Sequence, residues 1–279
     1  MWGGGFSNYF FLKIPRFESI SREYFTESFL QANRPVIVTQ AMDDWLASRL
    51  WTPSYFVSQF KEEWVQLYDS LFTLINVATI GDYIQTYFGS TTRRQESLPY
   101  VRAYAKFKSM DFIWADALFD KLQTHWQLPD FLPLDNYLLP NVPKGVEFKP
   151  HLHTCPAKGV FISAQGCETK LHQDPWCSDA VLCQLYGEKQ IYLIDPIKAR
   201  KFQGINSALE RLEHITYLDT LKPGEILFIP QGWLHHVITT SDSISLTWNF
   251  VHQSNCTYYQ KWLKTEMTPS DQAVIAFFS

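Results

Sequence analysis

Short apolar runs separated by turn residues dominate the second half of the chain. They are rich in β-branched and aromatic residues and bounded by Gly, Pro or Asp; they cover residues 159–166, 180–187, 189–196, 225–230, 235–240 and 243–252. Many short strands at this spacing are typical of an antiparallel sandwich or barrel. The pattern therefore predicts a mainly β core over about residues 131–255.

The first half of the chain alternates strand-like and helical segments. Residues 34–40 form an apolar, β-branched run that suits a buried strand. Helices are predicted over residues 52–60, 79–89 and about 111–126, where capping residues or helically spaced apolar residues occur. We expect residues 1–130 to form an α/β layer that supports the β core.

Neither a repeat nor a low-complexity linker separates the two halves, so we expect one domain over residues 1–279. A chain of this length can bury one large core. The tail, residues 256–279, has helical and apolar character. This tail either contacts a second copy, which would give a homodimer, or packs on its own barrel.

Charge and cysteine content narrow the class of protein. The formal net charge of -4 offers no general attraction to nucleic acids or anionic lipids, so we expect neither as a partner. Five cysteines without a CxxC spacing are typical of free thiols in a reducing compartment. The chain shows no signal peptide and no apolar run of membrane-spanning length, which predicts a soluble cytoplasmic protein.

The segment LHQDPW places His172 and Asp174 two residues apart. In an extended strand, residues i and i+2 point to the same side, so both side chains are directed at one point in space. Together they form half of a metal site.

A second source of imidazole lies in PGEILFIPQGWLHHV, which ends with His235 and His236 before Val237. Adjacent residues of a strand face opposite sides, so only one of the two histidines can join His172 and Asp174. Two imidazoles and one carboxylate form a facial triad with open positions, which suits non-haem Fe(II). A structural zinc site would instead fill all four positions.

Three segments together resemble one family: GCETKLHQDPW, then GEKQIYLIDP, then LKPGEILFIPQGWLHHV. They are similar to the cupin-type JmjC-domain family of Fe(II)/2-oxoglutarate oxygenases, and closer to its hydroxylases than to its histone demethylases. RPVIVTQAMDDW, near the start, is similar as well, so the resemblance covers about residues 17–255. It implies a double-stranded β-helix, or jelly-roll, core with flanking helices.

The resemblance implies that His172, Asp174 and His235 bind iron. His235 is chosen over His236 because it directly follows the GW-plus-apolar triplet. His236 then becomes a neighbour that either supports the site or packs in the core.

The resemblance also implies contacts to the 2-oxoglutarate cosubstrate. The residues that match these positions are Lys189, Thr169, Tyr100 and Asn249. Lys189 would pair with the distal carboxylate, a charge-assisted contact. Thr169 lies at an odd spacing from His172, which predicts a bend or bulge between them if both face the pocket.

The activity implied is hydroxylation of a C–H bond with O2, with release of succinate and CO2. The substrate is either a small molecule or a peptide or protein side chain. The alternative is a metal-binding cupin without oxygenase activity, such as an isomerase or a binding module. Convergence of Lys189, Thr169 and Tyr100 near the metal distinguishes the two interpretations.

Other aromatic and histidine residues are weaker candidates. Trp176 follows the HxD motif directly and, with Tyr104, is a candidate substrate contact; Trp248 is a lesser one. His151 and His153 form another H-x-H pair, for which a polar loop at the barrel mouth is the simpler interpretation than a second metal site.

Overall fold

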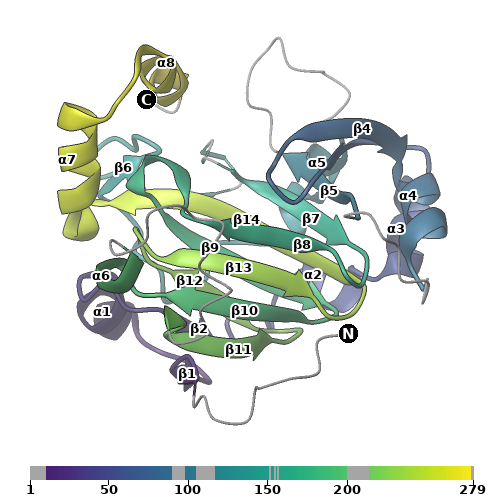
Figure 1. Cartoon of the computed structure of the whole chain (residues 1–279), viewed down its shortest axis with the longest axis horizontal. Coiled ribbons are helices and arrows are strands. Elements are labelled where there is room, and N and C mark those ends of the chain that lie inside the picture. Colours follow the sequence, from purple (N-terminus) through teal and green to yellow (C-terminus); the bar gives the residue numbers. More distant parts are fainter. Residues whose placement is uncertain are drawn as a thin grey trace.

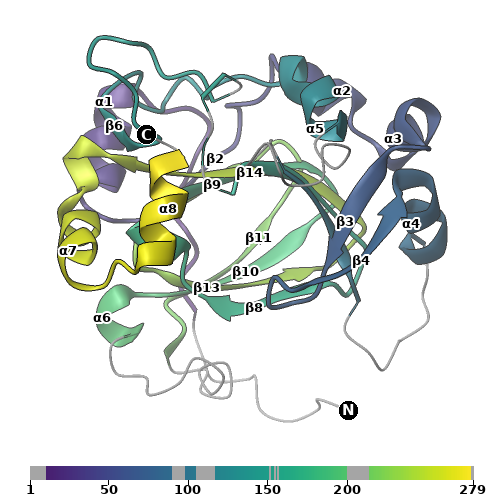
Figure 2. The ribbon, with the colours of Figure 1, turned by 90° about the horizontal axis from the view of Figure 1, so that it is seen from above.

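The structure is a computed structural model that describes residues 11–89, 98–104, 117–150, 152–153, 155, 157–199 and 214–277. Within these residues, two β-sheets face each other and enclose the interior of a barrel (Figures 1 and 2). The mainly β jelly-roll with flanking helices that the sequence predicts is confirmed.

The strands are ordered so that segments distant in sequence become neighbours. The larger sheet runs, in spatial order, through β1 (Arg16–Phe17), β2 (Val36–Val38), β12 (Ile226–Ile229), β9 (Asp179–Tyr186), β14 (Ser243–His252), β7 (Gly159–Ser163), β5 (Tyr100–Tyr104), β3 (Trp64–Tyr68) and β4 (Leu74–Thr79), with β6 (Tyr137–Leu139) beside β14. The smaller sheet contains β11 (Tyr217–Leu221), β10 (Lys189–Ile194), β13 (Leu234–Thr239) and β8 (Glu168–His172).

The amino-terminal strands join the core sheet and do not form a layer of their own. β2 pairs with β12, and β5 pairs with β7, both antiparallel. The sheet therefore carries residues from both halves of the chain on one continuous surface. This pairing brings Tyr100 on β5 to the wall of the barrel.

Helices and short turns connect and cover the strands. They are α1 (Arg22–Phe25), a π-helical turn (Thr26–Leu30), α2 (Leu46–Leu50), α3 (Pro53–Phe60), α4 (Ile80–Tyr87), α5 (Ala117–Leu122), α6 (Pro196–Ala199), α7 (Thr257–Thr265), α8 (Pro269–Phe277), and 3-10 turns at Gln123–His125, Pro175–Cys177 and Gln253–Asn255.

The predicted helices form where side chains cap their first turns. Thr52 accepts a hydrogen bond from the backbone N–H of Tyr55 at 3.2 Å and begins α3; Thr79 begins α4 in the same way. The helix predicted over about 111–126 is observed in its second half, as α5 and a 3-10 turn. Its first half lies outside the described residues.

Alternation along β14 separates the core from the barrel interior. Trp248 is fully buried on the side covered by the amino-terminal helices, where its ring stacks on Trp126 at a centroid distance of 5.4 Å. Ser245 and Asn249 point to the opposite side, because successive residues of a strand alternate. The inner face of this strand is thus polar.

The carboxyl-terminal helices α7 and α8 pack on the barrel of their own chain. Tyr259 of α7 forms a cluster with Leu139 and Val251, against which Trp176 and Trp262 pack. Association into a homodimer through this tail stays a prediction. Within the described residues, no helix is both long enough and apolar enough to cross a membrane.

The turn between β9 and β10 requires glycine at position 187. Its backbone φ is +69°, and a Cβ placed there would lie 1.9 Å from the carbonyl oxygen of Asp242. Gln184 holds the same turn by donating to the carbonyl of Gly187 at 2.8 Å. This turn sets the start of the strand that carries Lys189.

We expect Gly187→Ala to lower the free energy of unfolding by about 3 kcal/mol or more, because the backbone of Asp242 has to move. The matched control is Gly145→Ala, at φ +81° with nothing within 4 Å of the added Cβ. It should cost only about 1–2 kcal/mol for the left-handed conformation. Urea unfolding of both variants measures the difference, and equal losses would contradict the steric argument.

Candidate metal and cosubstrate site

Two neighbouring strands bring three potential metal ligands together. His172 ends β8, Asp174 follows it, and His235 lies on β13 directly opposite His172. One ligand atom from each residue lies within 4.8 Å of the other two. The imidazole centroids of the two histidines are 4.0 Å apart, and Nε2 of His235 is 3.8 Å from Oδ2 of Asp174.

Backbone carbonyls orient both imidazoles. Nδ1 of His172 lies 2.7 Å from the carbonyl oxygen of Lys170, and Nδ1 of His235 lies 3.2 Å from that of Trp233. If each Nδ1 carries the proton and donates it, each Nε2 presents a lone pair. This is the arrangement that fixes the tautomer of a metal-binding histidine.

The protonation state of His172 also suits a ligand. Burial, followed by the neighbouring His235, lowers the pKa of His172 to about 2. The imidazole is therefore neutral near pH 7. Binding of a metal ion does not have to displace a proton from it.

The donor set fits a divalent transition metal such as iron. Two imidazole nitrogens and one carboxylate oxygen leave positions of an octahedral ion open to other ligands. Among the described residues, these three form the group of His, Cys, Asp or Glu side chains close enough to hold an ion. A closed four-ligand zinc site does not match this set.

His236 points away from the cluster of His172, Asp174 and His235. Its Nε2 lies 3.6 Å from a carboxylate oxygen of Glu168, and its ring meets Tyr192 edge-on at 5.6 Å. The alternation of strand β13 therefore resolves the choice that the sequence left open. His235 is the member of the pair that faces the site.

A β-bulge lies in β8, between Thr169 and His172. His172 pairs with His235 and Thr169 pairs with Val237, so three steps along β8 match two steps along β13. The extra residue turns Thr169 to the same face as His172. The bulge that the spacing of these residues predicts is confirmed.

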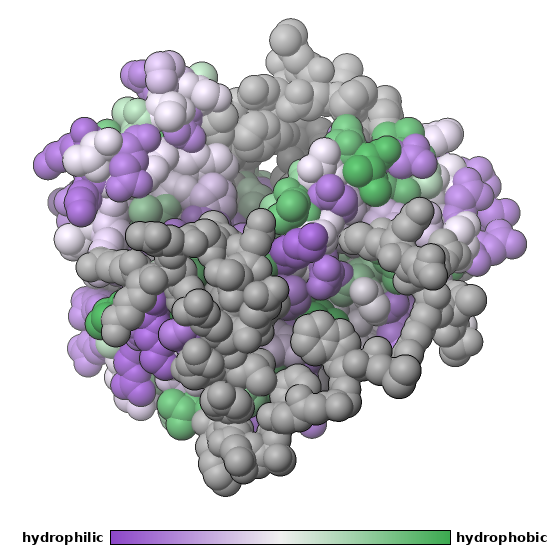
Figure 3. Space-filling view, in the orientation of Figure 1, coloured by the Kyte–Doolittle hydropathy of each residue, from purple (hydrophilic) through white to green (hydrophobic). Residues whose placement is uncertain are grey.

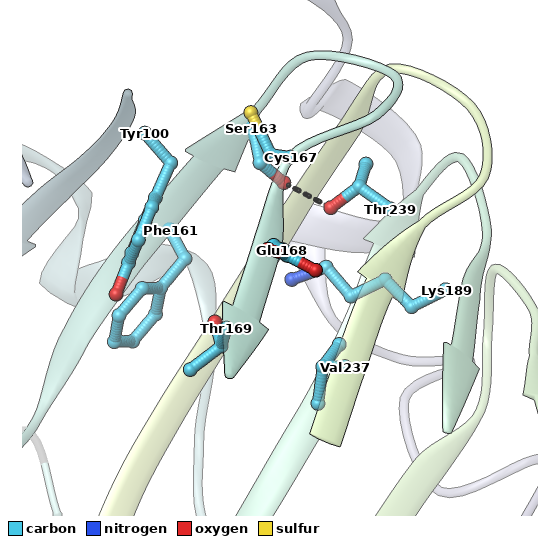
Figure 4. Close-up of a pocket in the computed structure, with 9 residues that line it drawn as sticks. All are labelled: Tyr100, Phe161, Ser163, Cys167, Glu168, Thr169, Lys189, Val237 and Thr239. Carbon is cyan, nitrogen blue, oxygen red and sulfur yellow. Dashed lines mark hydrogen bonds between the residues drawn. The ribbon is translucent and has the colours of Figure 1, made fainter. Parts of the chain in front are cut away.

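Lys189, Thr169 and Tyr100 line one pocket (Figure 4). The other lining residues are Phe161, Ser163, Cys167, Glu168, Val237 and Thr239. In Figure 4 the Lys189 side chain extends from β10 toward β8, and its nitrogen points to the side where Thr169 and Tyr100 lie. Three residues that the resemblance links to one carboxylate thus converge.

Lys189 is buried, and within the described part of the chain its ammonium group makes one hydrogen bond. Its Nζ donates to Oγ of Ser245 at 2.7 Å. Burial lowers the pKa of Lys189 to about 8. A buried cation without a carboxylate partner is costly, so the pocket favours an anionic ligand.

Tyr100 offers a further donor at the same place. Its hydroxyl is buried and makes no hydrogen bond of standard geometry with the described residues. Burial raises the pKa of Tyr100, so the phenol keeps its proton at neutral pH. Buried hydroxyls are normally paired, and a bound carboxylate would pair this one.

Asn249, Trp176 and Trp248 do not line this pocket, and their contacts with a ligand stay predictions. The Asn249 amide donates to the Ser178 hydroxyl at 3.0 Å and does not line the pocket. The Trp176 indole donates to Asp271 of α8 at 3.3 Å, in the carboxyl-terminal cluster. Trp248 is enclosed in the core and does not face the barrel.

The structure leaves two of the candidate residues without a described side chain. Tyr104 ends β5, but its side chain lies outside the described part of the structure, and so does the whole of His151. His153 makes local contacts, with its Nδ1 3.0 Å from the backbone nitrogen of Lys149. Nearby Cys155 is buried, which raises the pKa of its thiol to about 12 and disfavours the thiolate that a metal needs.

The sequence interpretation missed Ser245 and Arg102. Ser245 accepts the hydrogen bond of the Lys189 ammonium group. Its position on the polar face of β14 was the feature of the sequence that could have identified it. Arg102 lies two residues after Tyr100 on β5 and is 8% exposed. Because residues of a strand alternate, the side chain of Arg102 lies on the same face as that of Tyr100.

We expect His235→Ala to weaken the binding of Co(II) or Fe(II) by at least about 100-fold, because it removes a ligand. His236→Ala is the matched control, since it removes the adjacent imidazole on the other face of the strand. It should change the affinity less than about tenfold. Anaerobic metal titration with an optical readout measures both, and equal losses would exclude the assignment of His235.

The chain is similar to a known domain family and to several proteins that carry related domains. The cupin-like domain family matches residues 21–219 and 205–256. Arginine-specific demethylase JMJ20 of Arabidopsis thaliana is 22% identical over 90% of this chain and 59% of its own length. Lysine-specific demethylase 8 of Xenopus tropicalis is 22% identical over 85% of this chain and 53% of its own length. Jumonji C domain-containing protein 5 of Drosophila melanogaster is 20% identical over 84% of this chain and 59% of its own length.

The chain spans less than three fifths of the length of these relatives. Their names are those of demethylases or of the JmjC domain, so the nearer resemblance to the hydroxylases stays a prediction. The family match covers most of the barrel and the strands that carry His172, Asp174 and His235. The chain belongs to the cupin-like domain family, among its JmjC proteins.

Proposed function

We propose that the protein is an Fe(II)- and 2-oxoglutarate-dependent oxygenase. The reaction inserts one atom of O2 into a C–H bond of the substrate and the other into succinate, while 2-oxoglutarate loses CO2. The observation that carries this proposal is one barrel with two adjoining features. These are the His172, Asp174 and His235 cluster and the buried ammonium group of Lys189.

Each residue has a role that its surroundings support. His172, Asp174 and His235 would hold the iron, which supplies the redox chemistry when bound. Lys189 and Tyr100 would bind the distal carboxylate of 2-oxoglutarate, with Thr169 beside them. The enclosing strands exclude water from the reacting groups.

A peptide or protein side chain is the substrate class that we favour. Relatives named as arginine- and lysine-specific demethylases support it, since demethylation of this kind begins with hydroxylation of a methyl carbon. A small molecule is the second substrate class. The identities of 22% are too low to carry over either named residue specificity.

A cupin that binds metal without oxygenase activity is the competing function. Such a protein needs the metal cluster but has no use for a buried lysine in the adjoining pocket. The position of Lys189 therefore favours the oxygenase.

The proposal predicts a visible metal-to-ligand charge-transfer band when Fe(II) and 2-oxoglutarate bind without oxygen. Admission of O2 should then release succinate slowly, even without substrate. His172→Ala should lose both signals while its unfolding transition stays cooperative. Folded, metal-loaded protein that shows no band would support the non-oxygenase cupin.

Affinity for 2-oxoglutarate should fall as pH rises through about 8, the pKa of Lys189. The ammonium is charged below this pKa and binds the carboxylate; above it, the neutral amine does not, and the dissociation constant should increase about tenfold per pH unit. Lys189→Arg keeps its charge and should remove this dependence. The band titrated between pH 7 and 9.5 gives both profiles, and a flat wild-type profile would contradict the role of Lys189.

A further inference from the structure

The carboxylate of Asp174 lacks the support that both histidines of the metal cluster have. Backbone carbonyls orient His172 and His235, whereas no donor in the described part of the chain makes a hydrogen bond to Asp174. Nε2 of His235 lies 3.8 Å from its Oδ2, which is beyond hydrogen-bonding distance. The direction of this carboxylate therefore depends on the backbone that carries it.

The backbone that follows Asp174 is strained. In the turn Pro175–Cys177, Trp176 has a φ of +57° and Cys177 a φ of +48°. The left-handed region is unfavourable for any residue with a Cβ atom, and here two consecutive residues occupy it. Such a conformation persists only where the surrounding structure holds it in place.

Hydrogen bonds from the barrel hold the end of this turn. The backbone N–H and the hydroxyl of Ser178 both donate to the carbonyl of Pro175, at 3.2 Å and 2.8 Å. Asn249 of β14 donates to the same hydroxyl at 3.0 Å, and Ser178 is fully buried. These bonds fix the residue after the turn but do not involve the side chain of Trp176.

The carboxyl-terminal helices hold the turn from its other side. Helices α7 and α8 lie together at one end of the barrel (Figures 1 and 2). Trp176 and Cys177 pack against an apolar cluster that includes Tyr259 of α7, as Trp262 does. The outer surface of both helices is mostly hydrophilic, at the upper left of Figure 3, which is consistent with apolar residues that face inward.

Asp271, near the start of α8, adds a directed contact to this packing. Its Oδ1 accepts a hydrogen bond from the indole N–H of Trp176 at 3.3 Å. Its Oδ2 accepts from the backbone N–H of Thr268 at 2.9 Å, and the Thr268 hydroxyl accepts from the N–H of Asp271 at 3.2 Å, as in a capping box. Hydrogen bonds from Thr268, with a smaller contribution from Trp176, lower the pKa of Asp271. The indole therefore meets a charged acceptor at neutral pH, which strengthens the contact.

We infer that Asp271 is a positioning residue for the metal-binding carboxylate of Asp174 and acts through Trp176. The inference rests on the metal site of the proposed function. Because Asp271 holds the indole, the strained turn is kept from relaxing into right-handed conformations, and Asp174 stays directed at His172 and His235. Helix α8 thus supports the metal site, although it contributes no ligand to it.

Titration of the full chain with Co(II) tests the inference through two readouts. They are the dissociation constant and the visible d–d bands of the bound ion, which report its coordination. Trp176→Phe keeps an aromatic ring but removes the N–H donor, so the dissociation constant should rise at least about threefold, as for the loss of one hydrogen bond. The d–d bands should change as well, because Asp174 is displaced. Trp262→Phe, the same exchange in the same cluster, is the matched control and should leave both readouts unchanged.

A second pair of variants separates the indole contact from the helix cap. Asp271→Ala removes both, whereas Thr268→Ala weakens the cap and leaves the Asp271 carboxylate to Trp176. We expect Asp271→Ala to match Trp176→Phe, and Thr268→Ala to resemble the wild type. The double variant of Trp176→Phe and Asp271→Ala should bind Co(II) no more weakly than either single variant, because both changes remove the same contact. Thr268 is exposed and Asp271 partly exposed, so these variants should keep the cooperative unfolding of the wild type.

Several outcomes would overturn the inference. Unchanged affinity and bands in Trp176→Phe or in Asp271→Ala would show that the contact does not support the site. Equal losses in Trp262→Phe would assign the effect to the cluster as a whole, and equal losses in Thr268→Ala would assign it to the helix cap. Additive losses in the double variant would show that the two residues act separately. A wild-type protein that binds no Co(II) counts instead against the metal site, and so against the proposed function itself.

Discussion

The cost of burying the ammonium group of Lys189 governs the interior of this barrel. A cation removed from water needs polar partners, and the strands that face it supply hydroxyl groups from Ser245, Tyr100 and Thr169. On β14, the alternate residues Leu246, Trp248 and Phe250 turn the other way, into the hydrophobic core. The polar lining is confined to the region around Lys189, because Ile191 and Leu193 on the same face of β10 belong to an apolar cluster.

The two ends of the site share their supporting strands. β8 carries both His172 and Thr169, and β13 carries His235 and Val237 opposite them. The distance between the metal cluster and the cosubstrate pocket is therefore set by steps along a hydrogen-bonded ladder and not by a mobile loop. Sites held in this way keep their geometry without a ligand, which reduces the entropy lost on binding.

Residue types, spacing and the family resemblance together predicted that His172, Asp174 and His235 lie close to one another and that Lys189, Thr169 and Tyr100 converge. The HxD spacing indicated that His172 and Asp174 converge, and the odd position of Thr169 indicated a bulge. The contact of Trp176 with α8 could not be predicted, because Trp176 adopts φ +57° and Cys177 +48°; its contact with a substrate stays a prediction. Sequence patterns do not reveal such left-handed conformations at residues other than glycine.

The environment of Arg102 could not be predicted for a different reason. Its guanidinium carbon lies 4.6 Å from the ring centre of Phe72, and that ring meets the imidazole of His172 edge-on. Phe72 precedes His172 by a hundred residues, and their contact depends on a strained turn and on one backbone hydrogen bond to β8. Pairing among β3, β5 and β7 brings them together. Contacts of that kind arise from topology, which periodicity within a segment does not contain.

The bulge in β8 makes the conformation of the strand as important as the identity of its residues. In a regular strand, residues three apart face opposite sides. If the bulge were lost while every residue of β8 was kept, regular alternation would return. Thr169 would then point to the face on which His236 lies. A protein can thus keep all its ligand-binding residues and still lose one of them from the site through the straightening of a single strand.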